Sequence, residues 1–243
     1  MTRRIAMWSG PRNLSTALMR AFSRRSDTEV VDEPLYACYL AATGLDHPMR
    51  AEVLASMPAR VDEAVAAITV RPCAAAVQYQ KHMAQHLLPT MDRGWLAGLT
   101  HAFLLRDPRR VVASYAARRG SPTPEDLGFH QLLELYERLE AAGERPPVIL
   151  AEDILAAPRP ALVALCEALD VDFQEAMLRW PQGPLPGEGV WAPHWYGALW
   201  RSTGFGAPTP APERMPEPLE AVARACEPAF HRLYEARLPI ADS

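Results

Sequence analysis

The segment IAMWSGPRNLSTALMRAF, residues 5–22, decides the fold class of this chain. It begins with a short apolar run, continues through a compact Ser-Gly-Pro-Arg-Asn turn and ends in a helix-forming sequence. A buried strand, a glycine-containing turn and a helix in this order form anion-binding sites in many α/β proteins. The first N–H groups of such a helix have no intrahelical partner, and the helix dipole adds partial positive charge there. The segment therefore predicts a cradle for a phosphate-like group.

Three side chains in this turn suit an anion. Arg12 offers a planar guanidinium to phosphate or sulfate oxygens, and Ser15 and Thr16 add hydroxyl donors. The spacing G-x-x-x-x-G-K-[ST] of nucleoside triphosphatases is absent from the sequence, so we do not expect ATP held in the usual P-loop manner. The alternative is a plain strand–turn–helix connection in which the two hydroxyls only cap the helix.

The composition is that of a soluble globular protein. The chain has 243 residues, of which 49% are hydrophobic and 22% charged, which is enough for one large domain with a real core or for two small domains. The net charge of −4 argues against nucleic-acid binding through a basic surface. No apolar run approaches the roughly 20 residues that span a bilayer, and the first strand follows the N-terminus too closely for a signal peptide. We therefore expect a cytoplasmic protein with no membrane and no nucleic-acid partner.

Short apolar runs alternate with helical patterns along the first 150 residues. The runs that predict strands are 4–8, 29–31, 74–79, 102–105 and 148–151. The helices predicted between them are 14–25, 35–43, 61–68, 109–118 and 125–142. This alternation predicts an α/β fold, a three-layer, doubly wound, mainly parallel five-stranded sheet. Ligands in that architecture bind outside the carboxyl ends of the strands.

The remainder of the chain has a different character. Helices are predicted at 158–169, 173–179 and 219–238. Residues 181–218 are crowded with Pro and Gly and include the Trp-rich run VWAPHWYGALW at 190–200. Long loops of this kind are functional or disordered, and tryptophans are rare in disordered segments. We interpret 181–218 as a lid or wall over the site of a single domain that spans residues 1–243.

A second candidate phosphate site follows the fourth strand, in HAFLLRDPRRVVASY at 101–115. Arg106 lies where the strand meets its loop, and Asp107-Pro108 is a strong helix start. Ser114 lies eight residues beyond Arg106, about two turns into that helix, so both side chains can reach one phosphate. The alternative is a structural ion pair for Arg106 and a packing role for Ser114.

Together these two segments resemble the sulfotransferases that use 3′-phosphoadenosine 5′-phosphosulfate (PAPS). That family has a 5′-phosphosulfate loop after its first strand and an Arg and a Ser eight residues apart at a later strand–helix junction. The resemblance implies a P-loop nucleoside-triphosphate-hydrolase-like sulfotransferase fold, with PAPS as donor and adenosine 3′,5′-bisphosphate as product. The donor-binding residues that it implies here are Gly10, Pro11, Arg12, Asn13, Leu14, Ser15, Thr16, Arg106 and Ser114.

A third segment, WRSTGFG at 200–206, resembles the loop with which these enzymes close over the 3′-phosphate. The resemblance implies nucleotide contacts from Arg201, Ser202, Thr203 and Gly204, although an ordinary surface turn would have the same composition. The pair WSGPRNLST and DEPLY is similar to a bacterial and plant group of sulfotransferase-like proteins, some labelled by association with aminotransferases. Nothing in the sequence suggests pyridoxal phosphate chemistry, because Lys81 is the only lysine and no phosphate cup for that cofactor is visible.

The catalytic residues follow from the same resemblance. Arg12 would stabilise the leaving phosphate, and Lys81 would help to bind the sulfuryl group. Glu33, after the second strand, and His82, in a Lys-His pair expected after the third, are the two candidate bases, with Glu33 ranked first. If that segment is helical, His82 and His86 share a face, but no nearby third ligand supports a metal. The four cysteines form no C-x-x-C pair, so neither a zinc site nor a disulfide framework is expected.

The sequence also departs from the family pattern. Asn13-Leu14 replaces the usual Ser-Gly, which predicts a backbone less free to wrap a phosphate. The C-terminal dimer motif of cytosolic animal enzymes is absent, so the oligomeric state stays open. We expect a sulfotransferase that moves a sulfuryl group from PAPS to a hydroxyl of a small molecule or sugar by in-line displacement. The alternatives are a non-catalytic nucleotide-binding protein and a phosphotransferase that uses a nucleoside triphosphate.

Overall fold

The computed structural model describes residues 2–208 and 210–240 and contains a five-stranded sheet with the strand order β2-β3-β1-β4-β5. The strands are β1 Arg3–Ser9, β2 Thr28–Asp32, β3 Val77–Met83, β4 Thr100–Leu105 and β5 Val148–Leu150. The pairs β2–β3 and β4–β5 are parallel. The predicted α/β class with a mainly parallel five-stranded sheet is confirmed.

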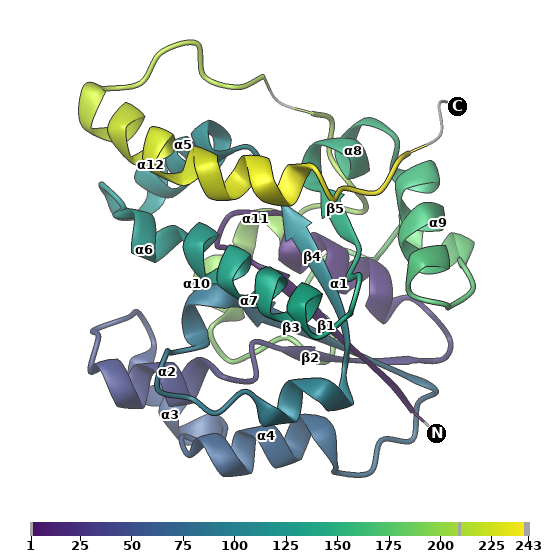
Figure 1. Ribbon diagram of the computed structural model, residues 1–243. Helices are drawn as coiled ribbons and strands as arrows, with labels where there is room; N and C mark the ends of the chain where they lie inside the picture. Colours follow the sequence, from purple (N-terminus) through teal and green to yellow (C-terminus); the bar gives the residue numbers. More distant parts are fainter. Residues whose placement is uncertain (1, 209, 241–243) are drawn as a thin grey trace. The chain divides into compact units, whose positions relative to one another are not determined.

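Helices connect these strands, as the labels of Figure 1 show. The α-helices are α1 Ser15–Ser23, α2 Tyr36–Thr43, α3 Arg50–Ser56, α4 Val61–Thr69, α5 Pro108–Arg119, α6 Pro124–Leu127, α7 Phe129–Ala141, α8 Ala151–Ala156, α9 Pro158–Ala168, α10 Ala192–Trp195, α11 Gly197–Trp200 and α12 Glu217–Tyr234. The 3₁₀ turns are η1 Ala84–His86, η2 Gly94–Gly98 and η3 Glu175–Leu178. Among the described residues, none of these helices is both long and apolar enough to cross a membrane.

The chain divides into two compact units. Unit 1 comprises the described residues of Met1–Met7, Thr16–Thr100 and Gln174–Gly204. Unit 2 comprises those of Trp8–Ser15, His101–Phe173 and Phe205–Ser243. The single domain expected from the sequence stays a prediction.

Unit 1 is built on the β2–β3 pair, in which Asp32 lies opposite Lys81. Every residue of β3 is buried, although its sequence VQYQKHM is largely polar. Such a strand is stable only if its polar groups are satisfied, and Gln80 illustrates this by donating through Nε2 to the Ile68 carbonyl at 2.7 Å. A separate hydrophobic cluster joins α2 to the Trp-rich run, with Tyr36, Leu40, Val53, Trp191 and Tyr196 among its buried members.

The boundaries of β3 correct one sequence-based prediction. The apolar run 74–79 was expected to form the third strand, but the strand is Val77–Met83. Apolar content therefore indicated the wrong residues, because the strand buries glutamine, lysine and histidine instead of a continuous aliphatic run. Lys81 and His82 consequently lie within the strand and not after it.

Unit 2 is built on the β4–β5 pair, with helix α12 packed against α5 and α7 (Figure 1). The single helix predicted for 125–142 is two helices, α6 and α7, because Gly128 adopts φ 75° between them. Thr123 and Asp126 form a capping box at the start of α6, so the first of the two helices has its own N-terminal signal. In unit 1, the helix expected at 173–179 is only the short 3₁₀ turn η3.

Candidate functional site

The predicted anion cradle follows β1 and has an unusual backbone. Arg12 has φ 63° and Leu14 has φ 70°, whereas Asn13 between them is not among the residues of positive φ. Alternation of right- and left-handed residues turns successive N–H groups into one concavity, a nest that suits an anion. The left-handed conformation destabilises a non-glycine residue by roughly 1–2 kcal/mol. Leu14 nevertheless adopts the conformation that a glycine would provide, so its side chain does not prevent the turn from forming.

Gly10 has a different role in the same turn. A Cβ atom at this position would lie 2.2 Å from the carbonyl oxygen of Leu127 at the end of α6. Gly10 is therefore required for close packing of the turn. Pro11 follows it in the turn, and Ser15, which is buried, begins α1 together with Thr16.

The two predicted phosphate motifs meet within unit 2. Arg12 donates from Nε to the Ser114 hydroxyl at 3.0 Å, and Arg106 donates from a terminal nitrogen to the Arg12 carbonyl at 2.7 Å. Asn13, which is buried, donates to the Leu104 carbonyl at 3.5 Å. We call Arg12, Arg106 and Ser114 the Arg12 cluster. Residues about a hundred positions apart in the sequence thus form one polar group.

The Arg12 cluster is rich in positive charge. Burial lowers the pKa of Arg12, and the neighbouring Arg118 and Arg106 lower it further. Burial also lowers the pKa of Arg106, whose Nε has no hydrogen-bond partner among the described residues and lies 3.8 Å from Oε1 of Glu152. Arg110 approaches the same carboxylate oxygen, with its Nε at 3.4 Å. Two carboxylates, Glu152 and Asp107, act on Arg106. They are fewer than the guanidinium groups gathered here, so positive charge remains that a bound phosphate would balance, and these residues fit a phosphorylated ligand.

Unit 1 holds a second polar group around the only lysine of the chain. Nζ of Lys81 lies 2.8 Å from Oδ1 of Asp32, 2.5 Å from Oε1 of Glu33 and 2.8 Å from the Tyr196 hydroxyl. An ammonium group has three N–H donors, and each of these three oxygens can accept one. We call Asp32, Glu33, Lys81 and Tyr196 the Lys81 cluster.

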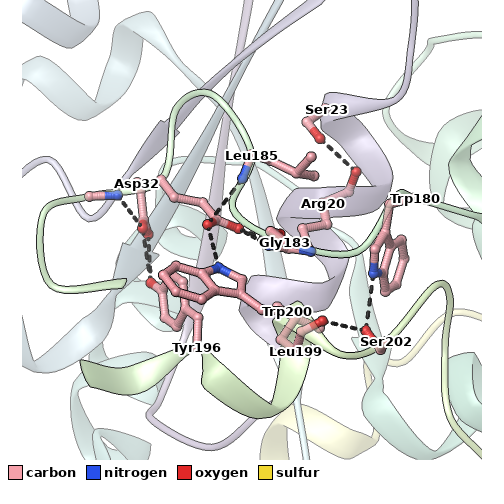
Figure 2. Close-up of polar contacts among 12 residues, drawn as sticks. Arg20, Ser23, Asp32, Trp180, Gly183, Leu185, Tyr196, Leu199, Trp200 and Ser202 are labelled. Atoms are coloured by element: carbon pink, nitrogen blue, oxygen red, sulfur yellow. Dashed lines mark hydrogen bonds and ion pairs between the residues drawn. The ribbon is translucent and has the colours of Figure 1, made fainter. Parts of the chain in front are cut away.

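Charges in the Lys81 cluster balance only in part. Burial alone would lower the pKa of Lys81, but attraction to Asp32 and Glu33 raises it well above its ordinary value. Burial raises the pKa of Asp32 against the opposing effect of Lys81, and burial also raises the pKa of Tyr196 well above its ordinary value. Tyr196 is therefore a neutral phenol that donates to Oδ2 of Asp32 at 2.9 Å (Figure 2). Lys81 is therefore an ammonium group shared by two carboxyl groups.

Glu33 is the more exposed of the two carboxyl groups in this cluster. It is the first residue after β2 and adopts a left-handed conformation with φ 45°. Its side chain is 12% exposed, compared with 1% for Asp32. Strained backbone of this kind persists where the surrounding structure imposes it, and it is concentrated at functional sites.

His82, the other candidate base, points away from Lys81. Successive residues of a strand point to opposite faces of the sheet, so Lys81 and His82 in β3 do not share a face. The His82 ring is buried, and its Nε2 lies 3.1 Å from Oε1 of Gln80, two residues earlier. The shared helix face considered for His82 and His86 is not present, because the first lies in a strand and the second ends the turn η1.

Two carboxylates, those of Asp32 and Glu188, hold the Trp-rich segment in place within unit 1. Gly189 donates its N–H to Asp32 at 3.1 Å, and Trp191 donates to the Tyr196 hydroxyl at 3.1 Å. Glu188 accepts from Arg20 at 2.7 Å and from the Trp200 indole at 2.8 Å. Figure 2 shows Arg20, Asp32, Tyr196 and Trp200 within this network.

Arg20, Asp32 and Glu188 were missed from the sequence. The one available signal was an arginine among the apolar residues ALMRAF of α1, where a buried charge needs a partner.

The predicted closing loop, Arg201–Gly204, also belongs to unit 1. Ser202 accepts from the Trp180 indole at 3.1 Å and donates to the Leu199 carbonyl at 2.7 Å (Figure 2). The Thr203 carbonyl accepts from the Trp180 N–H at 3.1 Å, Gly204 forms a β-bridge with Arg179, and Arg201 is exposed. Nucleotide contacts from these four residues stay a prediction.

Metal-binding side chains do not gather in the described part of the chain. No group of three or more His, Cys, Asp or Glu residues there could hold a metal ion.

Comparison with known proteins identifies the family. The model of the sulfotransferase domain family matches residues 3–232, so this chain belongs to that family. Membership supports sulfotransfer as the general chemistry of the chain and an enzymatic role.

Two curated relatives come from Arabidopsis thaliana. Branched-chain-amino-acid aminotransferase-like protein 1 is 39% identical over 212 residues, which are 87% of this chain and 38% of the relative. Branched-chain-amino-acid aminotransferase-like protein 2 is 35% identical over 229 residues, which are 94% of this chain and 41% of the relative. The chain therefore spans about two-fifths of the length of these relatives.

Solved structures support the fold. The sulfotransferase domain of the Synechococcus PCC 7002 olefin synthase aligns with a TM-score of 0.54 at 20% identity, covering 93% of this chain and 95% of that one. The sulfotransferase domain from the curacin biosynthetic pathway aligns with a TM-score of 0.54 at 18% identity, covering 93% and 98% of the two chains. At these identities the likeness establishes the fold.

Proposed function

We propose that this chain is a PAPS-dependent sulfotransferase that transfers a sulfuryl group to a hydroxyl of a small-molecule or carbohydrate acceptor in the cytoplasm. One observation carries the proposal: the Arg12 cluster joins the two sequence motifs that resemble the donor site. Direct contacts from Arg12 to Ser114 and from Arg106 to the Arg12 carbonyl support a shared role in binding phosphate groups.

The proposal gives the donor-binding residues separate tasks. The turn from Gly10 to Thr16 binds the 5′-phosphosulfate end, and Arg12 stabilises the charge that develops on the leaving phosphate. Arg106 and Ser114 bind the 3′-phosphate, with Arg201–Gly204 as further nucleotide contacts. PAPS supplies the sulfuryl group, so these residues have only to orient the donor and stabilise charge.

The Lys81 cluster supports Glu33 as the base that takes the proton of the acceptor hydroxyl. One carboxylate oxygen of Glu33 accepts from Lys81, and Glu33 is the more exposed of the two carboxyl groups in the cluster. His82 is the second candidate, but it lies on the opposite face of β3. We propose that Lys81 acts on Glu33, since Asp32, Glu33 and Tyr196 already accept from its ammonium group.

Calorimetric binding of adenosine 3′,5′-bisphosphate, ADP and ATP at one salt concentration tests the donor class. We expect the bisphosphate to bind tightest and Arg106→Ala to weaken its binding by about 100-fold, because a charge-assisted phosphate contact is lost. Arg60→Ala, at an exposed arginine of unit 1, is the matched control and keeps wild-type affinity. Tighter binding of ATP than of the bisphosphate contradicts the proposal, and so does the absence of binding by all three nucleotides.

Transfer of ³⁵S from labelled PAPS to a panel of alcohols, phenols and sugars tests the reaction. We expect Glu33→Gln to abolish turnover while bisphosphate binding is kept. Near-full turnover in Glu33→Gln together with its loss in His82→Ala would reverse the assignment of the base. Nucleotide binding without transfer to any acceptor or to water would favour a non-catalytic nucleotide-binding protein.

A further inference from the structure

His86 is a buried histidine that the proposed mechanism leaves without a role. Its ring stacks on Tyr36 and on Tyr39, with centroid distances of 4.7 Å in both cases. The side chain is 4% exposed, and Nδ1 has no hydrogen-bond partner among the described residues. A buried polar atom without a partner destabilises a protein by roughly 1–3 kcal/mol, so a ligand that satisfies Nδ1 gains from doing so.

His86 faces the free oxygen of Glu33. Oε1 of Glu33 accepts from Lys81, whereas Oε2 lies 3.9 Å from Nδ1 of His86. This distance is too long for a direct hydrogen bond. An oxygen atom could lie about 2.8 Å from both Oε2 and Nδ1. The angle at this oxygen between the two atoms would then be roughly a right angle, which a hydroxyl can accommodate.

The charge state of His86 agrees with this geometry. Burial lowers the pKa of His86 well below its ordinary value, and His47 and Lys81 lower it further. The charged and titratable groups that face its ring are His47, Lys81, Glu33 and the two stacked tyrosines. His86 is therefore a neutral imidazole, which offers a hydroxyl either an N–H or a lone pair at Nδ1.

We propose that the reacting hydroxyl of the acceptor binds between Oε2 of Glu33 and Nδ1 of His86, which makes His86 an acceptor-binding residue. This inference rests on the proposed function. The hydroxyl donates its proton to Oε2 and accepts a hydrogen bond from Nδ1–H. During transfer its O–H bond breaks and its oxygen bonds to sulfur. The proton moves to Glu33, and the bond from sulfur to the phosphate oxygen breaks with its electron pair on adenosine 3′,5′-bisphosphate.

Water is the probe that tests this position without knowledge of the natural acceptor. A water molecule bound there attacks PAPS slowly, and release of ³⁵S-sulfate measures the rate. The variants are His86→Asn, whose amide places a polar atom near the position of Nδ1, His86→Gln, whose amide reaches the position of Nε2, and His86→Phe, which keeps only the ring. His130→Asn, at an exposed histidine of α7, is the matched control.

We expect His86→Asn to hydrolyse PAPS within about threefold of the wild-type rate, and His86→Gln and His86→Phe to lose at least about tenfold, the effect of one hydrogen bond. Calorimetric binding of adenosine 3′,5′-bisphosphate should be unchanged in all three variants. That readout separates the two proposals. If the wild-type protein does not bind the bisphosphate, the donor assignment is refuted and not the role of His86. Equal hydrolysis rates in all variants overturn the role of His86, as does a wild-type protein that binds the bisphosphate but does not hydrolyse PAPS.

A crystal structure of the bisphosphate complex provides the second readout. In the wild type we expect an ordered oxygen atom within hydrogen-bond distance of both Oε2 of Glu33 and Nδ1 of His86. In His86→Asn it should contact Oε2 and the amide, and in His86→Phe no ordered oxygen atom should occupy this position. A wild-type complex without that oxygen overturns the proposal, even if hydrolysis depends on His86.

Discussion

The Arg12 cluster of unit 2 and the Lys81 cluster of unit 1 use charge in opposite ways. The Arg12 cluster gathers guanidinium groups, and burial together with their mutual repulsion lowers the pKa of Arg12. The Lys81 cluster gathers two carboxyl groups around one ammonium, and the Asp32 and Lys81 side chains are at most 2% exposed. A group with excess positive charge suits an anionic ligand, whereas a group in which one ammonium links two carboxyl groups fixes those groups in place. The difference predicts that the Arg12 cluster binds the donor, and that the other members of the Lys81 cluster position Glu33 for the acceptor.

Removing the only lysine should have the largest effect. Lys81→Met leaves Asp32 and Glu33 buried without their counter-charge, and we expect a loss of about 3–5 kcal/mol in the free energy of unfolding. Urea denaturation followed by circular dichroism measures this loss. Arg60→Met breaks an ion pair that is exposed on both sides and should have no measurable effect. Equal stability of the two variants would show that the Lys81 cluster is not an interdependent charge network.

The close packing of Gly10, in the turn that follows β1, predicts the next largest effect. Gly10→Ala places a methyl group 2.2 Å from the Leu127 carbonyl, and the shift that this forces should destabilise the protein by about 1–3 kcal/mol. Thermal and urea unfolding measure it. Gly98→Ala is the control, because no atom lies within 4 Å of a Cβ at that position. A Gly10→Ala protein as stable as Gly98→Ala would mean that α6 does not confine the turn.

The pH dependence of stability tests the effect of burying His86 beside the Lys81 cluster. Because the pKa of His86 is lowered in the folded state, the unfolded chain binds a proton below pH 6.5 that the folded chain does not. The free energy of unfolding should therefore fall as the pH decreases below about 6.5, with a slope of at most about 1.4 kcal/mol per pH unit from this group. Urea titrations of the wild type and His86→Phe from pH 8 to pH 5 measure the difference. Parallel curves would show that His86 does not contribute to this slope.

The smallest expected effect concerns the hydroxyl of the Arg12 cluster. Ser114→Ala removes the acceptor of the Arg12 Nε bond, and a single hydrogen bond contributes about 1 kcal/mol. Affinity for adenosine 3′,5′-bisphosphate should then fall about fivefold, measured by calorimetry against Ser121→Ala, an exposed serine, as control. An unchanged affinity would separate Ser114 from the phosphate site.

Predictions from the sequence were most accurate where the signal is local. The strand–turn–helix from Ile5 to Phe22 and the Arg106–Ser114 spacing depend on neighbouring residues, and the structure joins Arg12, Arg106 and Ser114 in unit 2. The third strand was predicted, but its bounds were wrong, because the polar residues of Val77–Met83 conceal a buried strand. Its glutamine, lysine and histidine are buried because partners distant in the sequence satisfy them, and hydrophobic periodicity does not detect such partners.

Sequence patterns were sufficient to predict the α/β class, the mainly parallel sheet and the sulfotransferase family. These follow from short-range patterns: apolar runs, a helix start and two motifs of fixed spacing. The folded structure was needed to show that Lys81 contacts Asp32, Glu33 and Tyr196. It also shows that His82 faces away and that Nδ1 of His86 lies opposite Glu33. The physical reason is that a buried charge is stabilised by whichever residues the fold brings to it, and their positions in the sequence are unrelated.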